Sequence, residues 1–138
     1  MKSIDCKVLR HAVERILKAH RLFAKFEEAS EFAVRITNPP YMPLTIERHA
    51  DRVTITHYFE QNGDLIPDPD MEFAVHNGQW LPVAMQFATG QYRVAIKIEE
   101  DEWKINRAEA KDQVEFAATW AKNLIEQGFE GGAAEIIS

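Results

Sequence analysis

The chain has 138 residues, of which 46% are hydrophobic and 10% aromatic, and its formal net charge is −6. This composition predicts one globular domain with its own core and excludes an intrinsically disordered chain. The acidic balance argues against sequence-independent DNA binding, because cationic side chains supply most of that affinity. No run of about 18 apolar residues occurs, so we expect neither a membrane span nor an export signal and place the protein in the cytoplasm.

The first predicted element is an amphipathic helix over residues 4–27, in which apolar side chains such as Val8 and Phe26 recur at helical spacing. From Asp5 to Lys25 the net charge is +4, against −10 for the remainder. The basic face is either a solvated surface balanced by acidic residues elsewhere, or a docking surface for an acidic protein or a nucleic acid. Its candidate partner-binding residues are Lys7, His11, Lys18, Arg21 and Lys25.

A two-residue period then predicts about six β-strands within residues 31–99. Turn signals separate them at Ala50-Asp51, Asn62-Gly63 and Asn77-Gly78. We expect Pro67 and Pro69 to keep the segment up to Asp70 irregular. Strands joined by short loops, with no helix between them, favour an antiparallel meander with one face covered.

The helical period returns over residues 107–127, with Gly128 placed as a C-cap. The tail, residues 130–138, contains two consecutive glycines and is expected to be flexible, although Ile136 and Ile137 leave docking in a groove open. We therefore predict a single α+β domain over residues 1–138, with one antiparallel sheet of about six strands flanked by an N-terminal and a C-terminal helix. A sheet edge or an apolar patch leaves a homodimer open.

The densest polar cluster lies between residues 57 and 72. Its candidate catalytic residues are His57, Tyr58, Glu60, Asn62 and Asp64, and its candidate metal ligands are Asp64, Asp68 and Asp70. Hard cations need several oxygen ligands, but the spacing is not that of an EF-hand, and no histidine has zinc-type spacing. Alternation places His57 on the apolar side, which favours a hydrogen-bonded core histidine over a catalytic base. We predict no cofactor, because the chain has no P-loop and no G-x-G-x-x-G motif.

Aromatic side chains on or beside the predicted strands raise the alternative of a single-strand nucleic-acid binder, because bases stack on such side chains in RNA-binding sheets. Their sequence neighbours are carboxylates more often than cations, so core packing is the preferred interpretation. These aromatic residues are Tyr41, Tyr58, Phe59, Trp80, Phe87 and Tyr92.

Three segments carry a resemblance to a known group of proteins: YMPLTIER, HYFEQNGDLIPDPDMEF and GQWLPVAMQFATGQY. In these segments the chain resembles an uncharacterised family of small bacterial and phage-associated domains of unknown function. The resemblance covers about residues 40–129, and its H-Y-x-E-Q-N-G-D and D-P-[DE]-M runs are the most specific part. It implies no catalytic residue, but it does imply an accessory protein of a plasmid, prophage or integrated element.

The leading hypothesis is a non-enzymatic accessory protein that binds a protein or nucleoprotein partner, for example as an inhibitor of a host defence complex. The alternatives are a small metal-dependent or small-molecule-binding enzyme centred on residues 57–72, and a single-strand nucleic-acid binder.

Overall fold

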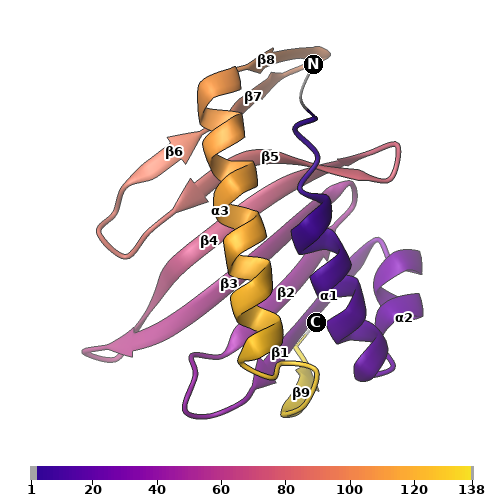
Figure 1. Cartoon of the computed structure of the whole chain (residues 1–138), viewed down its shortest axis with the longest axis vertical. Helices are drawn as coiled ribbons and strands as arrows, with labels where there is room; N and C mark the ends of the chain where they lie inside the picture. The colour runs from indigo at the N-terminus through magenta and orange to yellow at the C-terminus, as the bar shows by residue number, and fades with distance from the viewer. Residues whose placement is uncertain (1–2, 138) are drawn as a thin grey trace.

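The computed structural model describes residues 3–137 and has two layers, a seven-stranded antiparallel sheet and three helices. The helices are α1 (Lys7–Ala19), α2 (Phe23–Glu28) and α3 (Arg107–Glu126). Figure 1 shows α1 and α3 crossing the same face of the sheet, with α2 at its side. The predicted α+β class and the antiparallel sheet are confirmed. None of the helices among the described residues combines the length and apolar character needed to cross a bilayer.

The sheet is a meander to which one C-terminal strand is added. Its order is β6-β5-β4-β3-β2-β1-β9, and every neighbouring pair is antiparallel. The predicted turns occur as expected, with left-handed backbone at Ala50, Asn62 and Asn77. The strands are β1 (Glu31–Thr37), β2 (Leu44–His49), β3 (Arg52–Gln61), β4 (Asp64–His76), β5 (Gln79–Gln86), β6 (Tyr92–Val94) and β9 (Ala133–Ile136).

One apolar core fills the space between the helices and the sheet. Along each central strand, every second side chain faces the helices, as Val53 and Ile55 do on β3 and Met71 and Phe73 do on β4, all fully buried. The ring of Phe73 packs against that of Trp80 at 5.4 Å between centroids. This periodicity assigns the intervening side chains to the face that no helix covers.

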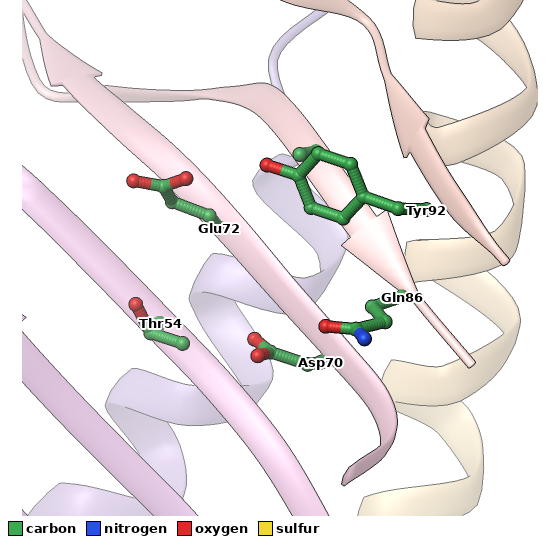
Figure 2. A pocket seen from close by; sticks show the side chains of 6 residues that line it. Thr54, Asp70, Glu72, Gln86 and Tyr92 are labelled. Carbon is green, nitrogen blue, oxygen red and sulfur yellow. The ribbon is translucent and has the colours of Figure 1, made fainter. Parts of the chain in front are cut away.

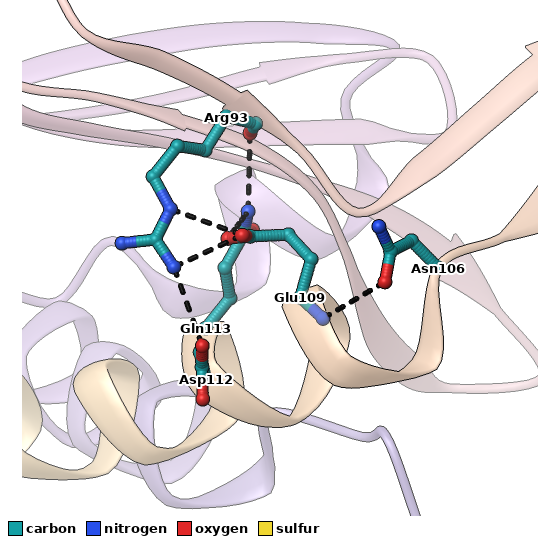
Figure 3. A network of polar contacts seen from close by, with 5 residues as sticks. All are labelled: Arg93, Asn106, Glu109, Asp112 and Gln113. Carbon is teal, nitrogen blue, oxygen red and sulfur yellow. Dashed lines mark hydrogen bonds and ion pairs between the residues drawn. The ribbon is translucent and has the colours of Figure 1, made fainter.

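Helix α3 has local start and stop signals, and it begins and ends almost where predicted. Asn106 caps it by accepting a hydrogen bond from the Glu109 backbone N–H at 3.1 Å, and Gly128 follows it with left-handed backbone. Its first two turns are fixed to β6, because Arg93 Nε donates to Glu109 Oε1 at 3.0 Å and Gln113 Nε2 donates to the Arg93 carbonyl at 3.1 Å (Figure 3).

The N-terminal helix predicted over residues 4–27 is divided into α1 and α2. Arg21 adopts left-handed backbone, with φ 61°, and Leu22 N–H then donates to the Leu17 carbonyl at 2.8 Å. The break turns α2 back toward the sheet and buries Phe26 against Phe32, with ring centroids 5.7 Å apart. Tertiary burial of an aromatic side chain therefore overrides the continuous helical period.

The segment from Asp64 to Asp70, predicted to be irregular, is part of strand β4. Only β3 pairs with this part of β4, because β5 reaches no further than Asp70. Pro67 and Pro69 therefore lie in an edge segment, where a missing backbone donor is tolerated. The acidic stretch is thus one arm of a long hairpin rather than a loop, and the register shifts between Thr56 and Tyr58 on the facing strand.

The sequence predicts strands of one sheet up to residue 99, but the chain leaves the sheet at Ala95. After β6 it forms a separate two-stranded sheet of β7 (Ile96–Glu99) and β8 (Glu102–Ile105). Ala95 N–H donates to the Val83 carbonyl and Asn106 N–H donates to the Ala95 carbonyl, both at 2.8 Å. This hairpin therefore connects the edge of the sheet to the start of α3.

The prediction of a flexible tail is wrong for residues 133–136, which form β9 beside β1. Two contacts precede the strand: Arg15 Nε donates to Glu130 Oε2 at 2.9 Å, and His20 Nε2 lies 2.9 Å from the Phe129 carbonyl oxygen. Phe129 itself is fully buried. The glycines permit the turn into β9, and the sheet edge supplies its partner; Ser138 lies outside the described residues.

Candidate functional site

The face of the sheet that no helix covers, called the open face here, carries a continuous set of polar side chains. Figure 2 views part of it, with the helices behind the strands. The strand register aligns one row of cross-strand partners over six strands, from β1 to β6. This row consists of Arg35, Thr45, Thr56, Asp70, Gln86 and Tyr92.

A hollow of about 160 Å³ lies on the open face over β3, β4 and β5, with Thr54, Asp70, Gln86 and Tyr92 among its lining residues. Thr56 Oγ1 donates to Asp70 Oδ1 at 3.3 Å. Other charges beside the hollow are compensated, since Arg52 Nη1 donates to Glu72 Oε2 at 3.0 Å. Asp70 therefore remains as a carboxyl group with one neutral hydrogen-bond donor.

The pKa values of two groups on the open face, Asp70 and Tyr58, are raised. Burial raises the pKa of Asp70 above its ordinary value, and the nearby Glu72 and Glu47 add to this, while the Thr56 hydroxyl acts in the opposite direction. Burial also raises the pKa of Tyr58, assisted by the charges of Asp70 and Glu47. The centre of this face is thus partly screened from water and negative in character.

The candidate residues of the 57–72 segment are divided between different places. Tyr58 and Asp70 are on the open face, but His57 is on the helix-covered face, as its alternation predicted. His57 is buried; its Nδ1–H donates to the Pro43 carbonyl at 3.2 Å, and its ring lies 5.5 Å from that of Trp120. Burial lowers the pKa of His57, so the neutral ring is favoured there.

The remaining candidates of that segment lie at or near the end of the β3–β4 hairpin. Glu60, Asn62 and Asp64 are exposed around its turn. Asp68 Oδ1 accepts a hydrogen bond from the Ala88 backbone N–H at 3.2 Å. Within residues 3–137, no three His, Cys, Asp or Glu side chains lie close enough together to hold a metal ion, so Asp64, Asp68 and Asp70 do not form one site.

A second surface lies over α1 and α2 and carries five exposed side chains, Lys7, His11, Lys18, Arg21 and Lys25, called the basic surface here. Two other cations of the segment form ion pairs within the chain, Arg10 with the buried Asp5 at 3.1 Å and the exposed Arg15 with Glu130 at 2.9 Å. No member of the basic surface forms an ion pair with any residue of the described chain. Lys18 Nζ instead lies over the Phe23 ring, 4.8 Å from its centroid.

An apolar groove of about 230 Å³ runs beside the basic surface, between α1 and α3. Val8 and Ala12 from α1 and Ala121 and Ile125 from α3 line it. The sequence assigned Val8 to the apolar side of the first helix, but 49% of its surface is exposed in the groove. The helical period identifies which residues of α1 lie on its apolar face, but it does not show which of them α3 leaves uncovered.

The lone cysteine is not part of either surface. Cys6 is buried, and its pKa is raised to about 12 by burial and by the charge of Asp5. The thiolate, which is the nucleophilic form, is therefore strongly disfavoured.

Comparison with known protein families places the chain in an uncharacterised group. A family model described as "Domain of unknown function (DUF6908)" matches residues 11–130. No curated protein and no solved structure matches the chain.

Proposed function

Because the chain belongs to the DUF6908 family of domains of unknown function, which assigns it no activity, we propose from its surface that it is a non-enzymatic interaction domain. The basic surface and the adjoining groove bind an acidic segment of a partner protein. The expected resemblance to an uncharacterised family is confirmed. In the cell, this proposal gives the protein an accessory role on a bacterial or phage element. Inhibition of a host defence complex is one version of that role.

The observation that carries the proposal is the lack of internal partners for the basic surface. The protein has 22 acidic and 16 basic side chains, so carboxylates are in excess, yet none pairs with these five residues within residues 3–137. Exposed cations that self-repel over two short helices lower stability slightly. An acidic partner removes that repulsion and gains charge complementarity, which steers association.

The groove supports a peptide-like partner over a purely ionic one. Val8 presents half of its surface beside His11 and Arg15, so apolar and cationic contacts are available within two turns of α1. A helix or extended segment with an apolar anchor and flanking carboxylates matches this combination.

A protein partner is favoured over a nucleic acid by the rest of the charge distribution. Outside the 5–25 segment the chain carries −10, which repels a long phosphate backbone that extends beyond the basic surface. Trp80 and Phe87, two of the aromatic residues considered for base stacking, pack in or against the core instead. Nucleic-acid binding is therefore the less favoured alternative, and the pull-down experiment distinguishes it from protein binding.

The test uses three tagged forms of the whole chain as baits in host extract, with and without nuclease treatment. The first is wild type, and the second carries Lys18→Glu, Arg21→Glu and Lys25→Glu. The control reverses the same number of charges at Lys104, Arg107 and Lys111, three exposed residues outside α1 and α2. We expect a stoichiometric protein to be retained by wild type and control and lost from the triple variant, read by quantitative mass spectrometry.

The captured protein is then purified and titrated against each bait by calorimetry. A contact at the basic surface predicts a loss of affinity of about 100-fold or more in the triple variant and a marked weakening at high salt. Equal affinity of all three baits would contradict the proposal. Recovery that depends on intact nucleic acid would replace the protein partner with a nucleoprotein or nucleic acid.

A further inference from the structure

A second and larger hollow lies at the other end of the open face, beside β1 and β2. Its volume is about 380 Å³, which is within the range of pockets that bind small molecules. Strands β1, β2 and β3 form its floor, while the β3–β4 hairpin and the end of the chain form two of its walls. The side chains that line it include Arg35, Thr45, Glu47, Tyr58, Leu65 and Ile137.

The floor contains a buried hydroxyl without a partner. Thr45 is only 3% exposed, and its Oγ1 has no hydrogen-bond partner among the described residues. Buried polar groups are almost always paired, because an unpaired one loses its hydration without compensation. Thr45 lines the hollow, so a polar atom of a ligand placed there supplies the missing hydrogen bond.

Opposite charges stand on two neighbouring strands of the floor. Arg35 on β1 is the cross-strand partner of Thr45, and Glu47 follows two residues later on the same face of β2. Neither Arg35 nor Glu47 forms an ion pair with another residue in the described range. The hollow thus offers one unpaired guanidinium and one unpaired carboxylate, each half-buried.

The walls of the hollow are apolar. Leu65 projects from the β3–β4 hairpin with 61% of its surface exposed, and Ile137 from the end of the chain with 38% exposed. Ile137 is fixed in place, because its backbone N–H donates to the Ala33 carbonyl at 2.9 Å. Two exposed aliphatic side chains beside two unpaired charges of opposite sign define a ligand with both charged and apolar parts.

We propose that this hollow binds a small zwitterion with an apolar side group, the chemical class of free hydrophobic amino acids. The ligand carboxylate lies against the Arg35 guanidinium and accepts a hydrogen bond from the Thr45 hydroxyl. The ligand ammonium lies against the Glu47 carboxylate, and the side group contacts Leu65 and Ile137. This site is on the opposite face of the sheet from α1, and the inference does not depend on the proposed function.

Three probes of matched size separate the contributions of the two charges. L-Phenylalanine carries both charges, 3-phenylpropanoate lacks the ammonium, and 2-phenylethylamine lacks the carboxylate. We expect L-phenylalanine to bind the whole chain with a dissociation constant below about 1 mM in calorimetry, and each analogue to bind about 10-fold more weakly or worse. Equal binding of all three probes, or no binding of L-phenylalanine at about 10 mM, would overturn the inference.

Substitutions locate the site. Arg35→Gln and Glu47→Gln are each expected to weaken L-phenylalanine binding about 10-fold, and Thr45→Val to weaken it about 5-fold. Thr54→Val is the matched control, since Thr54 is on the same face but lines the smaller hollow. Thermal melts confirm that each variant is folded. Wild-type affinity in both Arg35→Gln and Glu47→Gln would place the ligand elsewhere and refute the assignment.

Discussion

The two faces of the sheet use alternate residues of the same strands for different purposes. On the covered face, side chains such as Ile55 and Phe73 are fully buried against helices. On the open face, their sequence neighbours Thr54 and Glu72 remain in contact with water, and the charges there are incompletely paired. The comparison indicates that stability resides in one face and that the other is available for recognition.

The strongest test of this comparison makes one substitution on each face of the sheet, at residues of the neighbouring strands β3 and β4. Phe73→Ala removes a fully buried ring that packs against Trp80, and we expect it to lower the free energy of unfolding by about 3–5 kcal/mol. Thr54→Ala, on the open face of the paired strand, should change it by less than about 0.5 kcal/mol. Urea denaturation followed by fluorescence measures both. Comparable losses would mean that the open face is also structural.

The open face depends on the C-terminal strand for one wall of its larger hollow. Gly132 has φ +81°, and a Cβ there would lie 2.6 Å from the Thr37 carbonyl oxygen. Gly132→Ala is therefore expected to cost about 2 kcal/mol and to accelerate amide exchange in β9 and β1. Hydrogen exchange by mass spectrometry reads this directly.

The matched control for that substitution is Gly63→Ala. Gly63 has a similar φ of +85°, but a Cβ there meets nothing within 4 Å. It should cost only the backbone conformational penalty of about 1 kcal/mol and leave exchange in β9 unchanged. Equal effects at the two glycines would contradict a specific role for Gly132 in placing β9.

Local signals in the sequence predicted much of the covered side. The cap at Asn106 and the glycine after α3 lie next to the helix they delimit, and two of the three turns contain Asn-Gly, which favours left-handed backbone. The break at Arg21 was missed because no glycine or proline marks it, and it is set by burial of Phe26 against Phe32 and Trp80, which lie outside the helical segment. Strand β9 was missed for a similar reason, since its partner is β1 at the other end of the sequence.

The open face was less predictable, although part of the signal was present. Alternation alone shows that His57 and Tyr58 point to opposite faces, so they could not serve one site. It also predicts that Arg35 and Thr45 are on the uncovered side. Their meeting depends on the register between strands, which turn geometry and cross-strand packing set.

A smaller effect on the free energy of unfolding comes from the unpaired Thr45 hydroxyl on the open face. Thr45→Val replaces the unpaired hydroxyl by a methyl group of similar shape, so we expect it to raise the free energy of unfolding by about 1 kcal/mol. Thr54→Val, where the hydroxyl reaches water, should be near neutral. Chemical denaturation in the absence of ligand measures both. A loss of stability in Thr45→Val would show that the hydroxyl is already satisfied.

The faces also differ in how protons affect stability. Burial lowers the pKa of His57 below 6.5 on the covered face. As pH falls below about 6.5, the unfolded chain takes up a proton that the folded protein excludes, so stability decreases. His57→Gln should remove this acid-dependent loss, whatever its effect on absolute stability. Denaturation between about pH 7 and pH 5 measures the slope; an unchanged slope would mean that His57 is not its source.

Asp70 on the open face is expected to show the smallest effect, and its sign is opposite to that of His57. Burial raises the Asp70 pKa above its ordinary value of 3.8. At pH values between 3.8 and the raised pKa, the folded protein holds a proton that the unfolded chain has lost. Its contribution is therefore present at lower pH and lost as pH rises through the raised pKa. Asp70→Asn should flatten this decline, and Asp64→Asn, an exposed carboxylate at the hairpin turn, should not. If both variants leave the slope above about pH 4 unchanged, Asp70 is fully solvated, and the contrast in proton binding between the two faces is wrong.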